Sequence, residues 1–160
     1  MSMIVKKKPI CPKKKTYKKR KHPKFGTSKL EDDFAKNFLD KLKVKYTWQF
    51  EAKDIGRFFD YYLPDYNLII EIDGGYYHSD PRLYEEKDLN RMQKRNKKVD
   101  EYKNKWALMH GIPILRIWEK DIREDPKGVM KMLKERLNIE KEKITLNENK
   151  NKKRHINKIQ

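Results

Sequence analysis

The chain has 160 residues and a formal net charge of +17, with 41 Lys or Arg against 24 Asp or Glu. This length allows one domain with a core of its own but not two ordinary domains. One cysteine, Cys11, excludes an internal disulfide framework, and no apolar run approaches the length of a membrane span. We therefore expect a soluble protein of a reducing, cytoplasmic compartment.

Almost all of the net positive charge lies at the two ends of the chain. Residues 1–26 contain eleven Lys or Arg and no acid, and residues 141–160 contain seven basic residues against two acids. Basic arms bind polyanions, because each cation that neutralises a phosphate releases a condensed counterion. Solubilising tails, a nuclear-localisation signal or RNA contacts are the alternatives. We predict two flexible basic tails around a folded domain of residues 27–140, with DNA contacts from Lys13, Lys14, Lys15, Lys18, Lys19 and Arg20.

The first predicted element is a helix that begins after Ser28. Ser28 is a suitable N-cap, and Glu31, three residues later, completes a capping box. Apolar residues then recur at helical spacing and form one stripe, which consists of Leu30, Phe34, Phe38 and Leu42.

Three predicted strands follow this helix. Residues 44–51 alternate loosely between polar and apolar, and residues 57–63 are rich in aromatic side chains. Residues 67–73 contain the unbroken run Leu68-Ile69-Ile70, which is typical of a strand buried on both faces.

The second half of the predicted domain contains helices and one more strand. A polar helical region over about 81–110, with one break allowed, is ended by Gly111, in the position expected of a C-cap glycine. A strand over 113–118 and a short apolar-striped helix complete the domain. The order α-β-β-β-α-β-α predicts an α/β fold with a mixed central β-sheet flanked by helices.

Three acidic side chains are expected to meet at the end of this sheet. Asp60 lies in one strand, and Glu71 and Asp73 project from the same face of the next. Converging carboxylates repel one another strongly unless a cation lies between them. Such oxygen ligands suit Mg²⁺ or Mn²⁺, which can polarise a phosphate and activate a water molecule. His78, just beyond a Gly-Gly turn, could move a proton at this site.

Each of these residues also has a structural interpretation. Asp60 could be a solvated strand-edge residue, Asp73-Gly74 could be a simple turn, and Asp65 is best explained by the turn that contains it. Glu71 is different, because it interrupts a run that otherwise reads as fully buried, and an unpaired buried carboxylate is costly. The set as a whole therefore favours a metal site.

The pattern of these residues resembles the PD-(D/E)XK nuclease superfamily. In finer detail it resembles the very-short-patch-repair (Vsr-type) branch and the related phage homing endonucleases of the EDxHD type. The resemblance covers about residues 28–120. It rests on Asp60, on the run Glu71-Ile72-Asp73-Gly74-Gly75-Tyr76-Tyr77-His78, on Asn96 and Asp100 four residues apart, on Gly111 before an aliphatic strand, and on Trp118-Glu119.

The resemblance implies a role for each matching residue. Asp60 would be the central metal ligand, and Glu31 would be an acid behind it or a ligand of a second metal ion. His78 would be the catalytic base or acid, oriented by Asp100. The superfamily lysine position holds Asp73 here, so Lys103, near Asp100, would supply the displaced cation. Glu31 is also explained by its capping box, and Asp100 with Lys103 by a solvated helical pair.

Four further residues are predicted to contact nucleic acid near the site. Gln49 and Arg57 could contact phosphate. Tyr76 and Tyr77 could form the wall of a groove, stack on a base or wedge between bases. The zinc ligands of the repair-type members are absent, so the sequence does not support mismatch-repair specificity.

The sequence thus predicts a domain that hydrolyses DNA phosphodiester bonds with Mg²⁺ or Mn²⁺. The small size and the richness in Lys and Asn suggest, by analogy, a phage or mobile-element nuclease. Two alternatives remain open. One is a structure-selective nicking enzyme or junction resolvase, and the other is a catalytically silent nucleic-acid-binding protein.

Overall fold

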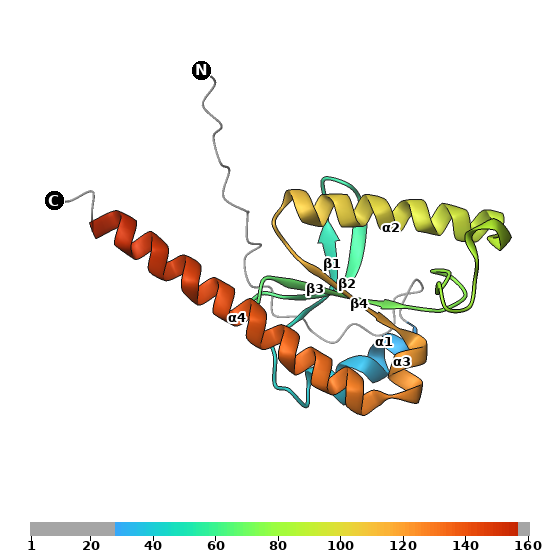
Figure 1. The fold of residues 1–160 in the computed structure, drawn as a ribbon, viewed down its shortest axis with the longest axis horizontal. Helices are drawn as coiled ribbons and strands as arrows, with labels where there is room; N and C mark the ends of the chain where they lie inside the picture. The colour runs from blue at the N-terminus through green and yellow to red at the C-terminus, as the bar shows by residue number, and fades with distance from the viewer. Residues whose placement is uncertain (1–27, 157–160) are drawn as a thin grey trace, which may run out of the picture.

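The computed structural model describes residues 28–156, with side chains up to residue 150, and contains one four-stranded sheet between helices (Figure 1). The strands follow one another across the sheet in chain order. The first strand is antiparallel to the second and the second to the third, whereas the third and the last are parallel. Their bounds are Thr47–Ala52 (β1), Arg57–Leu63 (β2), Leu68–Asp73 (β3) and Ile114–Trp118 (β4). The predicted α/β class with a mixed, helix-flanked sheet is confirmed.

The helices cover both faces of the sheet. Helix α2 (Arg91–Met109) lies on one face, and α1 (Lys29–Phe34), α3 (Glu119–Glu124) and α4 (Pro126–Ile156) lie on the other (Figure 1). Antiparallel hairpins join the first three strands directly, whereas the parallel strand β4 needs a crossover, and α2 is the helix of that crossover.

Helix α1 begins as predicted from its capping box. The hydroxyl of Ser28 accepts the backbone N–H of Glu31 at 3.3 Å, and the Glu31 side chain reaches back to the N–H of Ser28. The helix continues as a π-helical segment, Ala35–Leu39, whose Phe38 stacks on Phe34 with ring centroids 4.9 Å apart. This arrangement anchors the apolar stripe of the first helix against the sheet.

Two apolar cores form because the side chains of β3 alternate between the faces of the sheet. Leu68, Ile70 and Ile72 point toward α1 and α4 and belong to the larger core, whereas Ile69 packs with Trp106 beneath α2. By the same alternation Glu71 and Asp73 project toward α2. Every residue of β3 is buried, as the sequence predicted.

The second predicted helix is shorter than expected at its start. Residues 81–90 form turns and a single 3₁₀ turn, η2 (Glu86–Asp88), and α2 begins only after Asn90, which caps it together with Gln93. Asp80, which is 0% exposed, accepts the backbone N–H and the guanidinium of Arg82 at 2.9 Å, and Arg82 also binds Asp121 at 2.6 Å. These bonds tie the loop to α3 and compete with helix formation.

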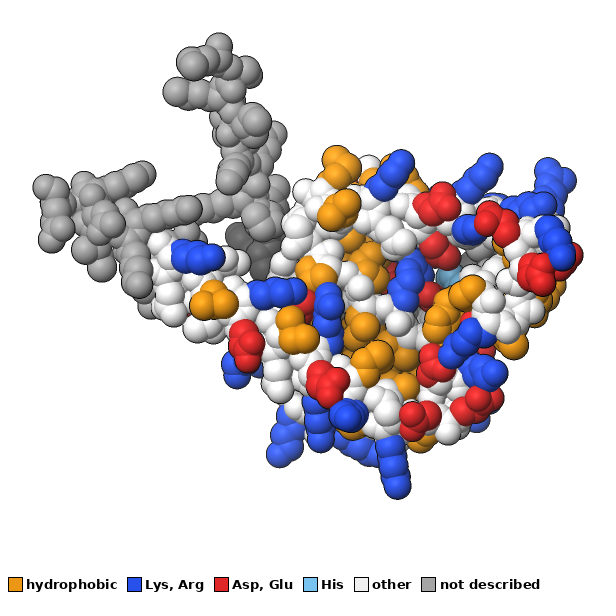
Figure 2. Space-filling model, in the orientation of Figure 1, with side chains coloured by type: hydrophobic (Ala, Val, Ile, Leu, Met, Phe, Trp, Pro, Cys, Tyr) orange, Lys and Arg blue, Asp and Glu red, His pale blue; other side chains and the backbone are white. Residues whose placement is uncertain are grey.

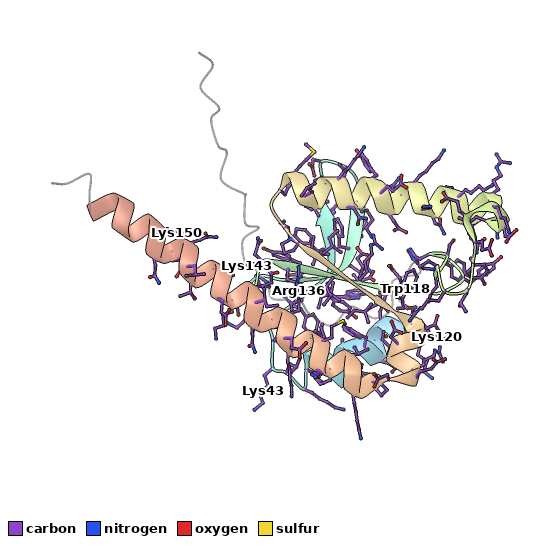
Figure 3. The ribbon with its side chains drawn as sticks, in the orientation of Figure 1. Lys43, Trp118, Lys120, Arg136, Lys143 and Lys150 are labelled. Atoms are coloured by element: carbon purple, nitrogen blue, oxygen red, sulfur yellow. The ribbon has the colours of Figure 1, made fainter. Side chains whose placement is uncertain are left out.

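Residues 141–156, which we predicted as part of a flexible basic tail, continue α4 in the structure. This helix runs beyond the edge of the sheet (Figure 1), with Lys and Arg side chains on its exposed surface (Figure 2), and Lys150 lies on the projecting part (Figure 3). The predicted arm of residues 1–26, with its six proposed DNA contacts, lies outside the described residues. Within the described part of the chain no helix is both long and apolar enough to cross a membrane.

Candidate active site

Asp60 lies where two neighbouring strands part. β2 and β3 pair from Tyr61–Ile70 to Leu63–Leu68, and the pairing stops before Asp60. There the backbone N–H of Ile72 donates to the Asp60 carboxylate at 2.7 Å. A side chain therefore takes the place of a strand-to-strand backbone bond, which fixes one carboxylate oxygen of Asp60 and leaves the other available.

Gln49 on β1 faces this point from the other side. It stands opposite Asp60 in the register, between the pairs Trp48–Tyr61 and Phe50–Phe59, and its φ is +49°. Such a backbone conformation is uncommon for a residue other than glycine and costs about 1–3 kcal/mol. The strained backbone places the Gln49 amide 3.2 Å from Glu31, to which it donates.

Glu31 reaches the site from α1. The Tyr61 hydroxyl donates to the Glu31 carbonyl at 2.7 Å and thereby fixes this turn of α1 against β2. Burial, and then the nearby charge of Asp60, raise the pKa of Glu31 from 4.5 to about 7. Burial also raises the pKa of Asp60. The charge of Asp60 thus acts on Glu31, and two acids that raise each other's cost of ionisation favour a proton or a cation beside them.

Glu71 has a basic partner. Lys103 of α2 places its Nζ 2.6 Å from Glu71 Oε1, and the ammonium lies 4.8 Å above the ring centre of Phe59. Glu71 is 3% exposed and Lys103 is 8% exposed. Burial and the charge of Asp60 raise the pKa of Glu71, although Lys103 opposes the shift. The pairing explains how a carboxylate can stand inside an otherwise apolar strand.

Asp73 is bound by Arg116, a residue that the sequence analysis did not select. The Arg116 Nη1 donates to both oxygens of Asp73 at 2.8 and 2.9 Å, and its Nη2 donates to Asn104 at 3.2 Å and contacts Asp100 at 3.4 Å. A signal for it was available, because Arg116 is the charged residue inside the apolar strand β4, as Glu71 is in β3.

His78 and Asp100 form the second half of the site. The Nδ1 of His78 lies 2.8 Å from Asp100 Oδ2 and 3.6 Å from Asp73 Oδ1. Burial alone would lower the pKa of His78, but its hydrogen bond to Asp100 and the charges of Asp73 and Asp100 outweigh burial and raise it. The loop that carries His78 is held to α2 by Gln93, which donates to the Tyr76 carbonyl at 2.9 Å.

The three predicted metal ligands act on one another electrostatically, because the charge of Asp60 acts on Glu71 and that of Asp73 acts on Asp60, but their partners differ. In the part of the chain that the structure describes, no three His, Cys, Asp or Glu side chains are arranged to hold a metal ion. We expected a metal ion to relieve the repulsion among the three acids. For Glu71 and Asp73, Lys103 and Arg116 supply the positive charge instead. Asp60 makes no ion pair with a described residue and keeps one free carboxylate oxygen.

A smaller ligand set fits Mg²⁺ on the chemistry of its donors. Mg²⁺ keeps several waters and is usually held by one or two carboxylates together with substrate phosphates. Asp60 and Glu31 are two neighbouring carboxylates, neither of them ion-paired with a described residue, and both have raised pKa values. They are the residues that could hold such an ion.

The predicted nucleic-acid contacts near the site have different surroundings. Tyr76 and Tyr77 are 51% and 60% exposed on the loop before His78, as a contact with a large ligand requires. Arg57 is exposed at the start of β2. Gln49 is not free to contact phosphate in this conformation, because its amide is bound to Glu31.

Comparisons with protein-family models, with curated proteins and with solved structures find no match to this chain. The resemblance to the PD-(D/E)XK nucleases therefore stays a prediction from the residues. A function for the site rests on its own geometry.

Proposed function

We propose that this protein is a metal-dependent DNA endonuclease whose reacting centre is Asp60. One observation carries the proposal. Asp60, which forms no ion pair with a described residue, accepts the N–H of Ile72, next to Asp73, whose Oδ1 lies 3.6 Å from His78 Nδ1, and the charge of Asp60 also acts on Glu31. Burying acids in this way lowers stability. A protein that only bound a polyanion would bind better without them, so the arrangement favours catalysis.

Each residue of the site has a defined task in this proposal. Asp60 and Glu31 would hold Mg²⁺ or Mn²⁺, which polarises the scissile phosphate and lowers the pKa of a bound water molecule. Asp100 holds the Nδ1 of His78, so that Nε2 is the atom that exchanges a proton with the attacking water or the leaving oxygen. Lys103 and Arg116 supply positive charge close to where charge develops on the phosphate.

A second function, nucleic-acid binding without cleavage, is favoured by the ion pairs of Glu71 and Asp73. With Lys103 and Arg116 in place, these two acids are satisfied inside the fold and need no metal ion. This alternative leaves the exposed basic surface as the functional feature. The two functions differ in what they require of Asp60.

A plasmid assay separates the two functions. Supercoiled plasmid is incubated with the full chain in Mg²⁺ or Mn²⁺, beside Asp60→Asn, His78→Ala and the control Asp65→Asn. The amide oxygen introduced by Asp60→Asn can still accept the N–H of Ile72, and Asp65 is an exposed turn residue, so both carboxylate variants should fold. We expect nicked or linear DNA from the wild type and from Asp65→Asn, a loss of at least about 100-fold in Asp60→Asn, and no product in EDTA.

Binding measured on the same samples completes the assay. Asp60→Asn should bind DNA as tightly as the wild type or more tightly, because one negative charge facing the phosphates is removed. A wild-type chain that retards the plasmid but leaves it supercoiled with every divalent metal would exclude the endonuclease and leave the binding protein.

A further inference from the structure

An open groove of about 830 Å³ lies between α2 and the start of β2. Its lining includes five cations and an aromatic side chain, Arg57, Arg91, Lys94, Arg95, Lys98 and Tyr102. All five cations are exposed, and Tyr102 is 49% exposed. No acidic side chain lines the groove, and none of the five cations forms an ion pair with a described residue, in contrast to their neighbour Lys97, which is bound to Glu86 at 2.8 Å.

The groove and the candidate active site use different sides of α2. Residues 91, 94, 95, 98 and 102 recur at helical spacing and share one side of the helix. Gln93, Asp100 and Lys103 lie elsewhere around the helix and contact the His78 loop and the sheet. Figure 2 shows blue side chains along the upper edge of the molecule, where α2 lies in Figure 1, with red side chains beside some of them. An ordinary solvated helix face mixes charges of both signs, whereas the side of α2 that lines the groove carries one sign only.

We infer that this groove binds the sugar–phosphate backbone of DNA, an inference that rests on the proposed function because DNA is taken as the substrate. From Arg91 to Tyr102 the helix rises about 17 Å at about 1.5 Å per residue. That length matches about five phosphates of one strand at about 3.4 Å each along the duplex axis. Arginine binds phosphate through two parallel hydrogen bonds, and the exposed ring of Tyr102 offers a flat surface to a sugar or a base.

The salt dependence of DNA binding tests the groove. The full chain is titrated against a fluorescent duplex in EDTA, so that no metal-dependent cleavage can occur, at several salt concentrations. Lys94→Gln/Lys98→Gln removes two groove cations. The control Lys36→Gln/Lys41→Gln removes two exposed lysines next to the first helix, on the opposite face of the sheet. Both doubles change the net charge equally and keep residues 1–26.

Each phosphate contact contributes about 0.9 to the slope of log affinity against log salt concentration. We expect Lys94→Gln/Lys98→Gln to make the slope less steep by about 1.8. The control Lys36→Gln/Lys41→Gln should change the slope by less than about 0.5. Equal changes in the two doubles, or no change in either, would overturn the inference, provided that urea unfolding shows both proteins to be folded. A groove double that loses affinity for single-stranded RNA but not for DNA would assign the groove to RNA and would also overturn it.

The outcome is independent of catalysis. A chain that shows the expected slopes but never cleaves plasmid rejects the endonuclease and leaves the groove intact. A chain that cleaves plasmid while both doubles keep the wild-type slope rejects the groove and leaves the endonuclease intact.

Discussion

His78 is oriented by charge rather than by packing. Asp100 binds its Nδ1, and Arg116 bridges Asp100 and Asp73 from the other side. Burial would raise the pKa of Asp100, but the hydrogen bond to His78 and the charges of His78 and Arg116 keep it low. The hydrogen bond to Asp100, together with the charges of Asp73 and Asp100, thus raises the pKa of His78.

Asp100→Asn should lower the pKa of His78, and histidine NMR resonances measure that pKa directly. The pKa of His78 in the folded chain is raised above the ordinary 6.5. The stabilisation from this interaction is therefore complete below about pH 6.5 and is lost as the pH rises through the folded-state pKa. The free energy of unfolding should then fall by more at about pH 5.5 than at about pH 9 in the variant. Glu101→Gln, at the exposed neighbouring position, should leave the His78 pKa unchanged. A His78 pKa that is the same in all three proteins would contradict the role of Asp100.

The side chains of β1 and β2 switch from one face of the sheet to the other at Gln49 and Asp60. Trp48 and Tyr61 pack with the larger core, whereas Phe50 and Phe59 pack with Trp106 under α2. In each strand two residues that are two positions apart therefore lie on opposite faces, whereas in a regular strand they would share one face. The positive φ of Gln49 marks the change, which opens the junction in which Asp60 caps Ile72.

Gln49→Val should be less stable than Gln49→Gly by about 1–2 kcal/mol, because a β-branched residue is disfavoured at positive φ. The control pair is Glu51→Val and Glu51→Gly, at an exposed β1 position that has no positive φ. There the order should reverse, because valine is preferred to glycine in an ordinary strand. Urea unfolding of the four variants gives the two differences. The same order at both positions would show that residue 49 is not held in a strained conformation.

The stability of the fold should depend on only part of its longest helix. Val129, Leu133 and Leu137 bury one side of α4 in the larger core, and Glu140 is the last buried residue of α4 whose side chain is described. Residues 145–150 are exposed. The projecting end of α4 therefore contributes charge rather than apolar burial.

Deleting residues 147–160 should change the free energy of unfolding by less than about 0.5 kcal/mol, because residues 147–150 are exposed and exposed positions away from the core contribute little. Leu133→Ala is the comparison, since it empties space in the core, and it should cost about 2–5 kcal/mol. Thermal and urea unfolding of both proteins check this. A deletion as costly as Leu133→Ala would mean that the end of α4 packs against another part of the chain.

Local patterns in the sequence were enough to predict most elements. The Ser28–Glu31 capping box, the apolar run of β3 and the aromatic β2 each depend on a few neighbouring residues, and all three are present in the structure. Asp60, Glu71 and Asp73 were found for the same reason, because an acid inside an apolar strand stands out without knowledge of its partners, whereas Glu31 and Asp100 were selected from the family resemblance. The predicted helix does not extend over its first turns, because Arg82 binds both Asp80 and Asp121, and Asp121 lies far along the chain.

Contacts between distant segments of the chain decide which cation each buried acid binds. Lys103 and Arg116 lie 32 and 43 residues from Glu71 and Asp73 along the chain, and α2 and β4 bring them there. Residue type and spacing indicate that a buried carboxylate needs a positive charge beside it. They do not indicate whether a lysine, an arginine or a metal ion supplies that charge. Only the packing of α2 and β4 against β3 shows that Glu71 and Asp73 are already ion-paired, whereas Asp60 and Glu31 form no ion pair with a described residue.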